Sequence, residues 1–211
     1  MADASLSDII FTTRAMRRLK PDPVPDDLIR KILEAGVSAA NGGNFQRWRF
    51  MVVTDRAVKH AVQVWYKKAF DEVVGPRYAK SPPPPGITPE KYARQHHAVE
   101  YLTEHFHEAP VWIVACLDEG TATPTRWSGA SIYPAVQNML LAARALGLGS
   151  TLTTRHLLYA KEAEAALGLP DGVHSYAILP IGWPLGKFGP VGRTALGDVV
   201  FSEAWGRPYP G

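Results

Sequence analysis

Two segments near the start of the chain combine residue types that could bind a phosphorylated, heteroaromatic ligand. The first, residues 14–19 (RAMRRL), gathers guanidinium groups, whose planar forks fit phosphate oxygens better than an isolated ammonium does. The second, residues 39–50, joins a Gly-Gly turn, where backbone can approach a ligand closely, to the amides of Asn41 and Asn44. Together these segments predict a site for a phosphate group and a polar ring.

The elements that must position these two segments follow from short-range patterns. Ser5 and Asp8 have the spacing of a helix capping box, and apolar residues continue on one helical face. This predicts a helix over residues 5–19 with the arginines near its C-terminal end. A proline-rich connection follows, after which Asp26 is predicted to cap a second helix that leads into the Asn-Gly-Gly loop at residues 41–43.

The rest of the chain alternates strand-like and helix-like segments. Strands are predicted at residues 48–53, 111–117 and 176–181, and helices at residues 55–74, 91–107, 130–146 and 160–167. Residues 75–88 contain four consecutive prolines and predict an exposed excursion. The single cysteine, Cys116, excludes an internal disulfide and predicts a buried, unreactive thiol in a strand. No repeat or linker divides the chain, so residues 1–211 are predicted to form one domain.

Composition excludes several classes of protein. With 211 residues, 46% apolar and 20% charged, the chain is typical of a soluble domain with a proper core. No apolar run is long enough to span a bilayer and no signal-peptide pattern is present, which favours a cytoplasmic protein with no membrane partner. The net charge of +3 is scattered and accompanies no nucleic-acid-binding motif, so no nucleic-acid partner is expected.

Common cofactor motifs are incomplete. Residues 147–152 begin Gly-x-Gly but lack the third glycine of a dinucleotide-binding fingerprint, and no Walker A sequence occurs. Glu104 and His107 have the i, i+3 spacing of a di-iron ligand pair, but the second such pair and the further carboxylates are missing. No metal site is expected.

Four segments, in order, resemble the FMN-dependent nitroreductase family. Residues 14–19 resemble its Arg-Ser-x-Arg-x-Phe motif, and residues 39–48 (AANGGNFQRW) its Ala-Pro-Ser-x-x-Asn-x-Gln-Pro-Trp loop. Residues 181–193 are similar to its closing Gly-x-Pro and arginine pair, and residues 131–155 to the helix and loop that pass over one flavin face. The cofactor-binding residues that the resemblance implies are Arg14, Ala15, Met16, Arg17, Asn41, Asn44, Leu152, Thr153, Thr154 and Arg193.

The resemblance also implies roles for these residues. Arg14 and Arg17 would bind the flavin phosphate and the edge of the isoalloxazine, with Arg193 as a second phosphate ligand. Asn44 would contact the flavin, and residues 152–154 would lie against the ring and offer a backbone N–H near N5. Three departures from the family pattern, Ala15 for Ser, Ala40-Asn41 for Pro-Ser and Arg47 for Pro, remove a hydroxyl donor and change the ring contacts.

The fold that the resemblance implies is α+β, a mixed and mainly antiparallel sheet flanked by helices. Residues 64–107 would form a lid or variable insertion, and an extended C-terminal tail, with the aromatic residues 205–210, would wrap over the partner of a homodimer or pack on its own protomer. The activity implied is reduction of FMN by NAD(P)H followed by transfer of electrons to a nitroaromatic, a quinone or a similar small electron acceptor. No catalytic side chain is then required from the protein.

Two other functions stay open from the sequence. The chain could be a flavin enzyme of the same fold with another reaction type, such as reductive dehalogenation or flavin fragmentation. It could also be an FMN-binding storage or sensor protein without turnover. Neither the physiological acceptor nor the choice between NADH and NADPH follows from the sequence.

Overall fold

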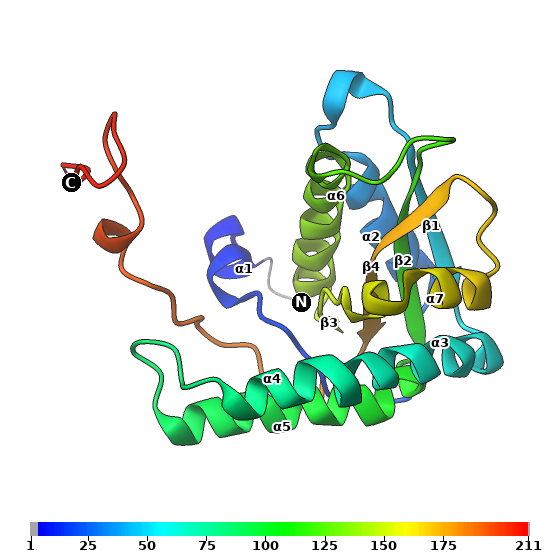
Figure 1. The fold of residues 1–211 in the computed structure, drawn as a ribbon, viewed down its shortest axis with the longest axis horizontal. Helices are drawn as coiled ribbons and strands as arrows, with labels where there is room; N and C mark the ends of the chain where they lie inside the picture. The colour runs from blue at the N-terminus through cyan, green and yellow to red at the C-terminus, as the bar shows by residue number, and fades with distance from the viewer. Residues whose placement is uncertain (1–3, 211) are drawn as a thin grey trace.

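The computed structural model describes residues 4–210 and is built around a four-stranded sheet. Its strands are β1 (Trp48–Val53), β2 (Val111–Asp118), β3 (Gly149–Ser150) and β4 (Val173–Gly182), in the order β1-β2-β4-β3. Each of the three pairings is antiparallel, and Trp48 of β1 lies opposite Leu117 of β2. The structure therefore confirms the predicted α+β class and its mainly antiparallel sheet (Figure 1).

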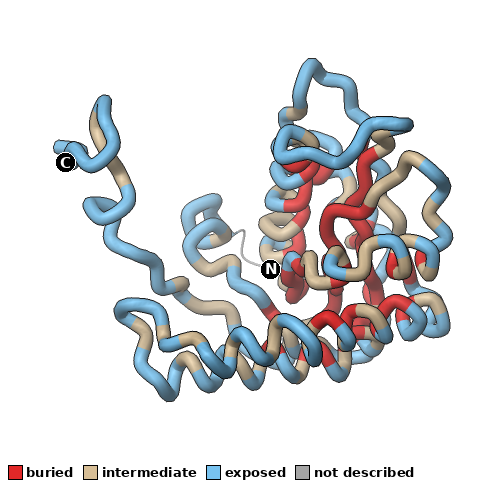
Figure 2. Tube along the Cα trace, in the orientation of Figure 1, coloured by how far each residue is buried: buried red, intermediate tan, exposed pale blue. Residues whose placement is uncertain are grey.

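Helices cover both faces of this sheet. They are α1 (Leu6–Thr12), α2 (Asp26–Val37), α3 (Arg56–Ala69), α4 (Gly75–Lys80), α5 (Pro89–His105), α6 (Arg126–Ala145) and α7 (Ala160–Leu167). Alternate residues of β2 point to opposite faces: Ile113 packs with α2 and α6, whereas Trp112 packs with α3, α5 and α7. Because both faces are covered, β2 is buried along nearly its whole length (Figure 2), which explains its uninterrupted apolar sequence.

The first helix is much shorter than predicted. The expected capping box between Ser5 and Asp8 is present, but the helix ends at Thr12, and residues 14–17 are extended rather than helical. Thr13 adopts extended dihedral angles, and the N–H of Met16 donates to the carbonyl of Ser150 at 2.9 Å. A tertiary hydrogen bond to the edge of the sheet thus replaces the next helical turn, which local propensity could not indicate.

Other boundaries differ by smaller amounts. Pro25 rather than Asp26 is the N-cap of α2. Helix α6 begins at Arg126, before the predicted residue 130, because Thr125 and Ser128 form a reciprocal capping box. The predicted helix over residues 55–74 is α3 followed by one π-helical stretch, Phe70–Val74, which continues into α4.

Of the predicted excursion over residues 75–88, only the proline-rich residues 81–88 form a loop, since residues 75–80 form helix α4. This loop joins α4 to α5, and α5 lies beside the helical stretch from α3 to α4 past the end of the sheet (Figure 1). The predicted strand thiol is also found: Cys116 is buried in β2, and burial raises its pKa to about 12. A thiol in that setting is a poor nucleophile at neutral pH.

The chain after β4 leaves the sheet and extends away from the rest of the molecule (Figure 1). It first pairs with the N-terminal segment, where the N–H of Leu185 donates to the carbonyl of Arg18 and that of Val191 to the carbonyl of Phe11. Its end carries Trp205, of which 91% is exposed. The tail is thus extended as predicted, and the Trp205 ring contacts that of Phe201 within the tail, with 4.7 Å between the ring centroids.

Candidate functional site

Arg17 is positioned by an extended segment that pairs with the edge of the sheet. The Met16–Ser150 hydrogen bond lies on one side of it, and the N–H of Lys20 donates to the carbonyl of Trp183 at 2.8 Å on the other. Leu19 and Pro184 form an isolated β-bridge. Because this pairing fixes the backbone on both sides, the Arg17 side chain is held next to the segment that follows β3.

That following segment, residues 151–154, contains the predicted flavin-facing residues 152–154. Thr153 is buried and exchanges two backbone hydrogen bonds with Ile178 of β4, at 3.1 and 2.9 Å. Leu152 beside it is 39% exposed. Since the N–H of Thr153 is already used, a backbone donor to a ligand at this loop has to come from Thr151, Leu152 or Thr154.

The structure brings Arg17 and this loop together around one cavity of about 480 Å³. We call it the arginine cavity, because it contains two guanidinium groups. It is lined by Arg17, Tyr66, Val74, Tyr78, Val99, Leu102, Thr151, Leu152, Thr153, Thr154, Arg155, Leu157 and Leu158. Four of the ten predicted cofactor-binding residues, Arg17 and residues 152–154, thus share a single cavity.

The arginine cavity is strongly electropositive. Burial lowers the pKa of Arg17 and of Arg155, but arginine titrates so far above neutrality that both remain charged. Among residues 4–210, neither side chain forms a salt bridge with a carboxylate. Partly desolvated cations without a counter-ion are costly, so this cavity is suited to a negatively charged ligand.

Tyr66 forms part of the cavity wall and adds a neutral donor. Burial raises the pKa of its hydroxyl, against the opposing effect of Arg155 and Arg17. The Thr153 hydroxyl donates to the Tyr66 oxygen at 2.9 Å, so the Tyr66 proton is free to point elsewhere. The cavity therefore offers hydroxyl donors as well as two cations.

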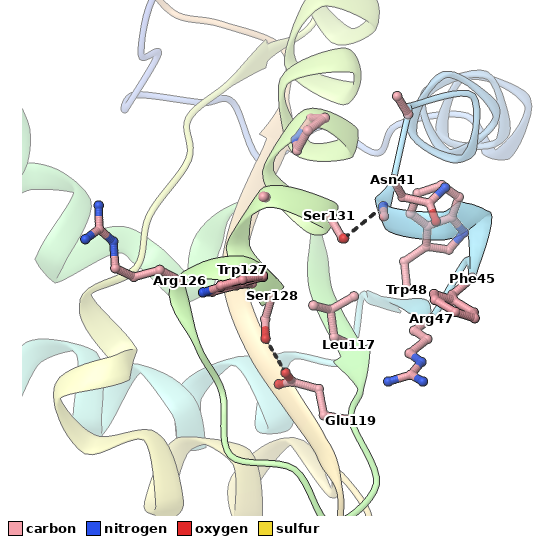
Figure 3. A pocket seen from close by; sticks show the side chains of 14 residues that line it. Asn41, Phe45, Arg47, Trp48, Leu117, Glu119, Arg126, Trp127, Ser128 and Ser131 are labelled. Carbon is pink, nitrogen blue, oxygen red and sulfur yellow. Dashed lines mark hydrogen bonds between the residues drawn. The ribbon is translucent and has the colours of Figure 1, made fainter.

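Asn41 lies in a different, larger cavity of about 1060 Å³, which we call the α6 cavity (Figure 3). Its walls are the 40–48 loop and the first turns of α6, and it shares no lining residue with the arginine cavity. Phe45 and Trp127 on its two walls are 72% and 85% exposed. Large exposed aromatic side chains around a hollow are typical of a surface that binds another molecule.

Hydrogen bonds hold the 40–48 loop in shape. The Asn41 side-chain oxygen accepts from the N–H of Gln46 at 3.0 Å, and the N–H of Gly42 donates to the Ser131 hydroxyl at 3.3 Å (Figure 3). Asn44 is exposed with a φ of 53°, a left-handed conformation that Asn tolerates better than most residues. Asn41 thus supports the loop, while the Asn44 side chain lies at its surface.

The remaining predicted residues line neither cavity. Arg14 and Ala15 are exposed, although the charge of Arg14 is near enough to contribute to the lowered pKa of Arg17. Met16 is buried, and its backbone N–H donates to the carbonyl of Ser150 at the edge of the sheet. Arg193 is exposed and donates to the carbonyl of its neighbour Gly192 at 2.9 Å.

Nine lining residues of the arginine cavity were not among the predicted site residues, and three of these, Arg155, Tyr66 and Tyr78, have side chains that could act on a ligand. Arg155 directly follows the predicted loop, so its position in that motif was an available signal. Tyr66 and Tyr78 stand in the 64–107 segment, where no spacing marks them, and only the packing of α3 and α4 brings them to the cavity. Within residues 4–210 no cluster of three or more potential metal ligands occurs, and none of the helices is long and apolar enough to cross a membrane.

Comparisons with known proteins agree with this geometry. The model of the nitroreductase family matches residues 10–183. An NADH dehydrogenase of Thermus thermophilus is 29% identical over 197 residues, which cover 89% of this chain and 90% of the relative. A 5,6-dimethylbenzimidazole synthase of Rhodospirillum rubrum is 28% identical over 186 residues, 84% of this chain and 81% of the relative.

Solved structures give the same fold. An iodotyrosine deiodinase bound to FMN and 3-iodo-L-tyrosine superposes with a TM-score of 0.71 at 22% identity, over 95% of this chain and 99% of that one. The family match spans β1 to β4 and both the arginine segment and the loop that follows β3. This chain therefore belongs to the nitroreductase family of flavin oxidoreductases.

Proposed function

We propose that this protein is an FMN-dependent oxidoreductase that takes electrons from NAD(P)H and passes them to an electron-poor small molecule such as a nitroaromatic or a quinone. The observation that carries the proposal is the arginine cavity, where Arg17 and residues 152–154 meet. Its two guanidinium groups lack a carboxylate partner within the described chain, and its hydroxyls add neutral donors. Arg17 and these hydroxyl groups fit the carbonyl oxygens of the FMN ring.

The residues of this chain then have defined tasks. FMN, when bound, supplies the hydride and electron chemistry, which needs no acid, base or nucleophile from the protein. Arg17 would hold negative charge at the pyrimidine edge of the ring, because a fixed cation in a partly dry cavity stabilises charge more than water does. Arg14 and Arg193 are assigned to the phosphate, and Leu152, Thr153 and Thr154 to one face of the ring.

The separation of the two cavities supports a homodimer. Asn41 and Asn44 were expected to serve the same flavin as Arg17, yet Asn41 lies in the α6 cavity and the two cavities have no residue in common. A second copy of the chain would resolve this if its 40–48 loop reached the arginine cavity of the first. The exposed tail with Trp205 offers a further segment that could cover the partner.

We therefore expect the protein to sediment at twice the 23.1 kDa of one chain. Replacing Trp127 by Asp is expected to weaken this association and to lower the FMN content at the same time. The exposed indole lies on the surface that the partner subunit would cover, and a carboxylate would be costly to bury there. Sedimentation equilibrium and the absorbance of the released flavin measure the two effects.

The matched control is Val64→Asp, an exposed apolar residue of α3 that lines neither the arginine cavity nor the α6 cavity. It is expected to leave the sedimentation unchanged. A monomeric wild-type protein that still binds FMN fully would contradict the shared site.

The activity itself is tested by the visible spectrum. The purified protein, or the protein after addition of FMN, is expected to show flavin bands near ~450 nm that bleach when NADH or NADPH is added without oxygen. Addition of a nitroarene or a quinone should restore the bands. A colourless protein that takes up no FMN would refute the proposal, and flavin that stays oxidised would favour another reaction type or a binding protein.

A further inference from the structure

The side chain of Arg155 is held by other contacts than those of the other arginines near the proposed flavin site. Its guanidinium lies 4.4 Å from the Tyr66 ring centroid and 4.9 Å from that of Phe70, and one of its nitrogens donates to the Thr103 hydroxyl at 2.5 Å. All three partners belong to residues 64–107, the segment that the family resemblance gives as a lid or variable insertion. Arg155 is thus oriented by this segment and not by the N-terminal one.

The held position leaves most of the donors of Arg155 unused. A guanidinium has five N–H donors, and Thr103 takes one. The contacts with two aromatic rings and the bond to Thr103 restrict the side chain, so little conformational entropy is lost when it binds a ligand. Such a pre-oriented fork matches the two oxygens of a carboxylate.

Apart from three threonines, the other walls of the arginine cavity are apolar or aromatic. Val74, Val99, Leu102, Leu157 and Leu158 surround the two guanidinium groups and the phenol rings of Tyr66 and Tyr78. A purely inorganic anion would leave these apolar walls without contact. An aromatic ring that carries one acidic group would bury its ring against them and pair its charge with the arginine.

We propose that the arginine cavity binds the acidic group of an aromatic acceptor, a carboxylate on a benzene-sized ring, and that Arg155 is the residue that selects acceptors with this charge. The inference rests on the proposed function, since it concerns the second substrate of the same site. Tyr66, which is fully buried, would contribute through its ring, which holds the Arg155 guanidinium in place. Arg155 acts through binding, so it determines specificity and takes no part in the electron transfer.

The test compares 4-nitrobenzoate with 4-nitrobenzyl alcohol, which have similar size and differ in charge. Binding to the flavin-loaded protein is measured by calorimetry without NAD(P)H. The wild-type protein is expected to bind the acid about 10- to 100-fold more tightly than the alcohol, as for one charge-assisted pair. Arg155→Gln should reduce this ratio to within about threefold, and Arg155→Lys, which keeps the charge but loses the fork, should give an intermediate ratio.

Arg30→Gln is the matched control, because Arg30 is an exposed arginine of α2 that lines neither the arginine cavity nor the α6 cavity. It should keep the wild-type ratio. The same order of ratios is expected in kcat/KM when the two compounds serve as acceptors.

Equal binding of the acid and the alcohol by the wild-type protein would overturn the proposal. So would an Arg155→Gln variant that keeps the wild-type ratio. A variant that no longer binds FMN would also overturn it, because Arg155 would then serve the cofactor. A protein that prefers the acid but never oxidises NAD(P)H would refute the proposed turnover while supporting the binding of an aromatic acid. The two failures are therefore distinguishable.

Discussion

Replacing Arg17 by Ala is expected to weaken FMN binding by about 10- to 100-fold, since a hydrogen bond to a charged group contributes about 1.5–3 kcal/mol. Arg17 is the predicted flavin ligand that reaches into the arginine cavity beside the 151–154 loop. Within the described residues no carboxylate neutralises it, so its interaction with a ligand is not shared with an internal ion pair. Titration of the apoprotein with FMN, followed by flavin fluorescence, measures the change.

Arg17→Ala weakens FMN binding but should not lower the stability of the protein without FMN. Removal of a partly desolvated cation that has no counter-ion is expected to leave the melting temperature of the apoprotein unchanged or to raise it. The increase in melting temperature that FMN produces should become smaller, because ligand stabilisation follows the affinity. Opposite effects on the two forms separate a lost ligand contact from general damage to the fold.

Arg18→Ala is the control for this prediction. Arg18 is adjacent in the sequence but exposed, and its guanidinium lies 4.8 Å from the centroid of the Tyr101 ring, outside the arginine cavity. Its removal should change the FMN affinity by less than about threefold, as expected for a screened surface charge. An Arg17→Ala variant that binds FMN within twofold of the wild type would refute the assignment of Arg17.

Elements whose boundaries depend on local signals were predictable from the sequence. Strand β1 has the predicted bounds, because its aromatic and β-branched run ends where polar residues begin. Helix α7 also has its predicted bounds, and Gly168 ends it in a left-handed conformation with a φ of 69°. In both cases the residues that decide the boundary are neighbours in the chain.

Elements decided by distant contacts were not predictable in this way. Residues 14–17 have a helix-compatible sequence but are extended, because Met16 bonds to Ser150 across 134 positions of sequence. The two-residue strand β3 has no pattern of its own and exists through its pairing with β4. Local propensity is a weak guide wherever a tertiary hydrogen bond competes with it.

Some residues of the candidate site could be predicted from the sequence and others could not, for the same reason. Resemblance to a family identified Arg17 and the 152–154 loop, and the structure places them around one cavity. Tyr66 and Tyr78 could not be identified, since their role depends on how α3 and α4 pack beside the loop. The assignment of Asn41 to the same ligand needs a second chain, which no pattern within one sequence describes.

The second large prediction concerns His156, which is next to Arg155 in the sequence. Acidification is expected to destabilise the protein through this one side chain. It is fully buried, and burial lowers its pKa to about 4 from an ordinary value of 6.5. Between these two pH values the unfolded chain binds a proton that the folded protein does not, so stability falls as the pH decreases from 6.5 to 4. The difference of pKa corresponds to about 3 kcal/mol.

The hydrogen bonds around His156 explain why it stays neutral. The Ser175 hydroxyl donates to a Glu164 carboxylate oxygen at 2.9 Å, so it can only accept from Nε2 of His156, 3.2 Å away. This assigns the proton to Nε2 and leaves Nδ1 without a partner among the described residues. A second proton would have to be placed on Nδ1, where a buried charge would have no acceptor.

The His156→Gln variant keeps a side-chain N–H that can donate to Ser175, but the glutamine side chain does not take up a proton in this pH range. Urea unfolding at pH 7 and pH 4.5 should show a loss of stability that is smaller by about 2–3 kcal/mol in this variant than in the wild type. His97→Gln, at an exposed position of α5, serves as the control and should lose as much stability as the wild type. Equal losses in the wild type and in His156→Gln would show that His156 does not set the acid limit.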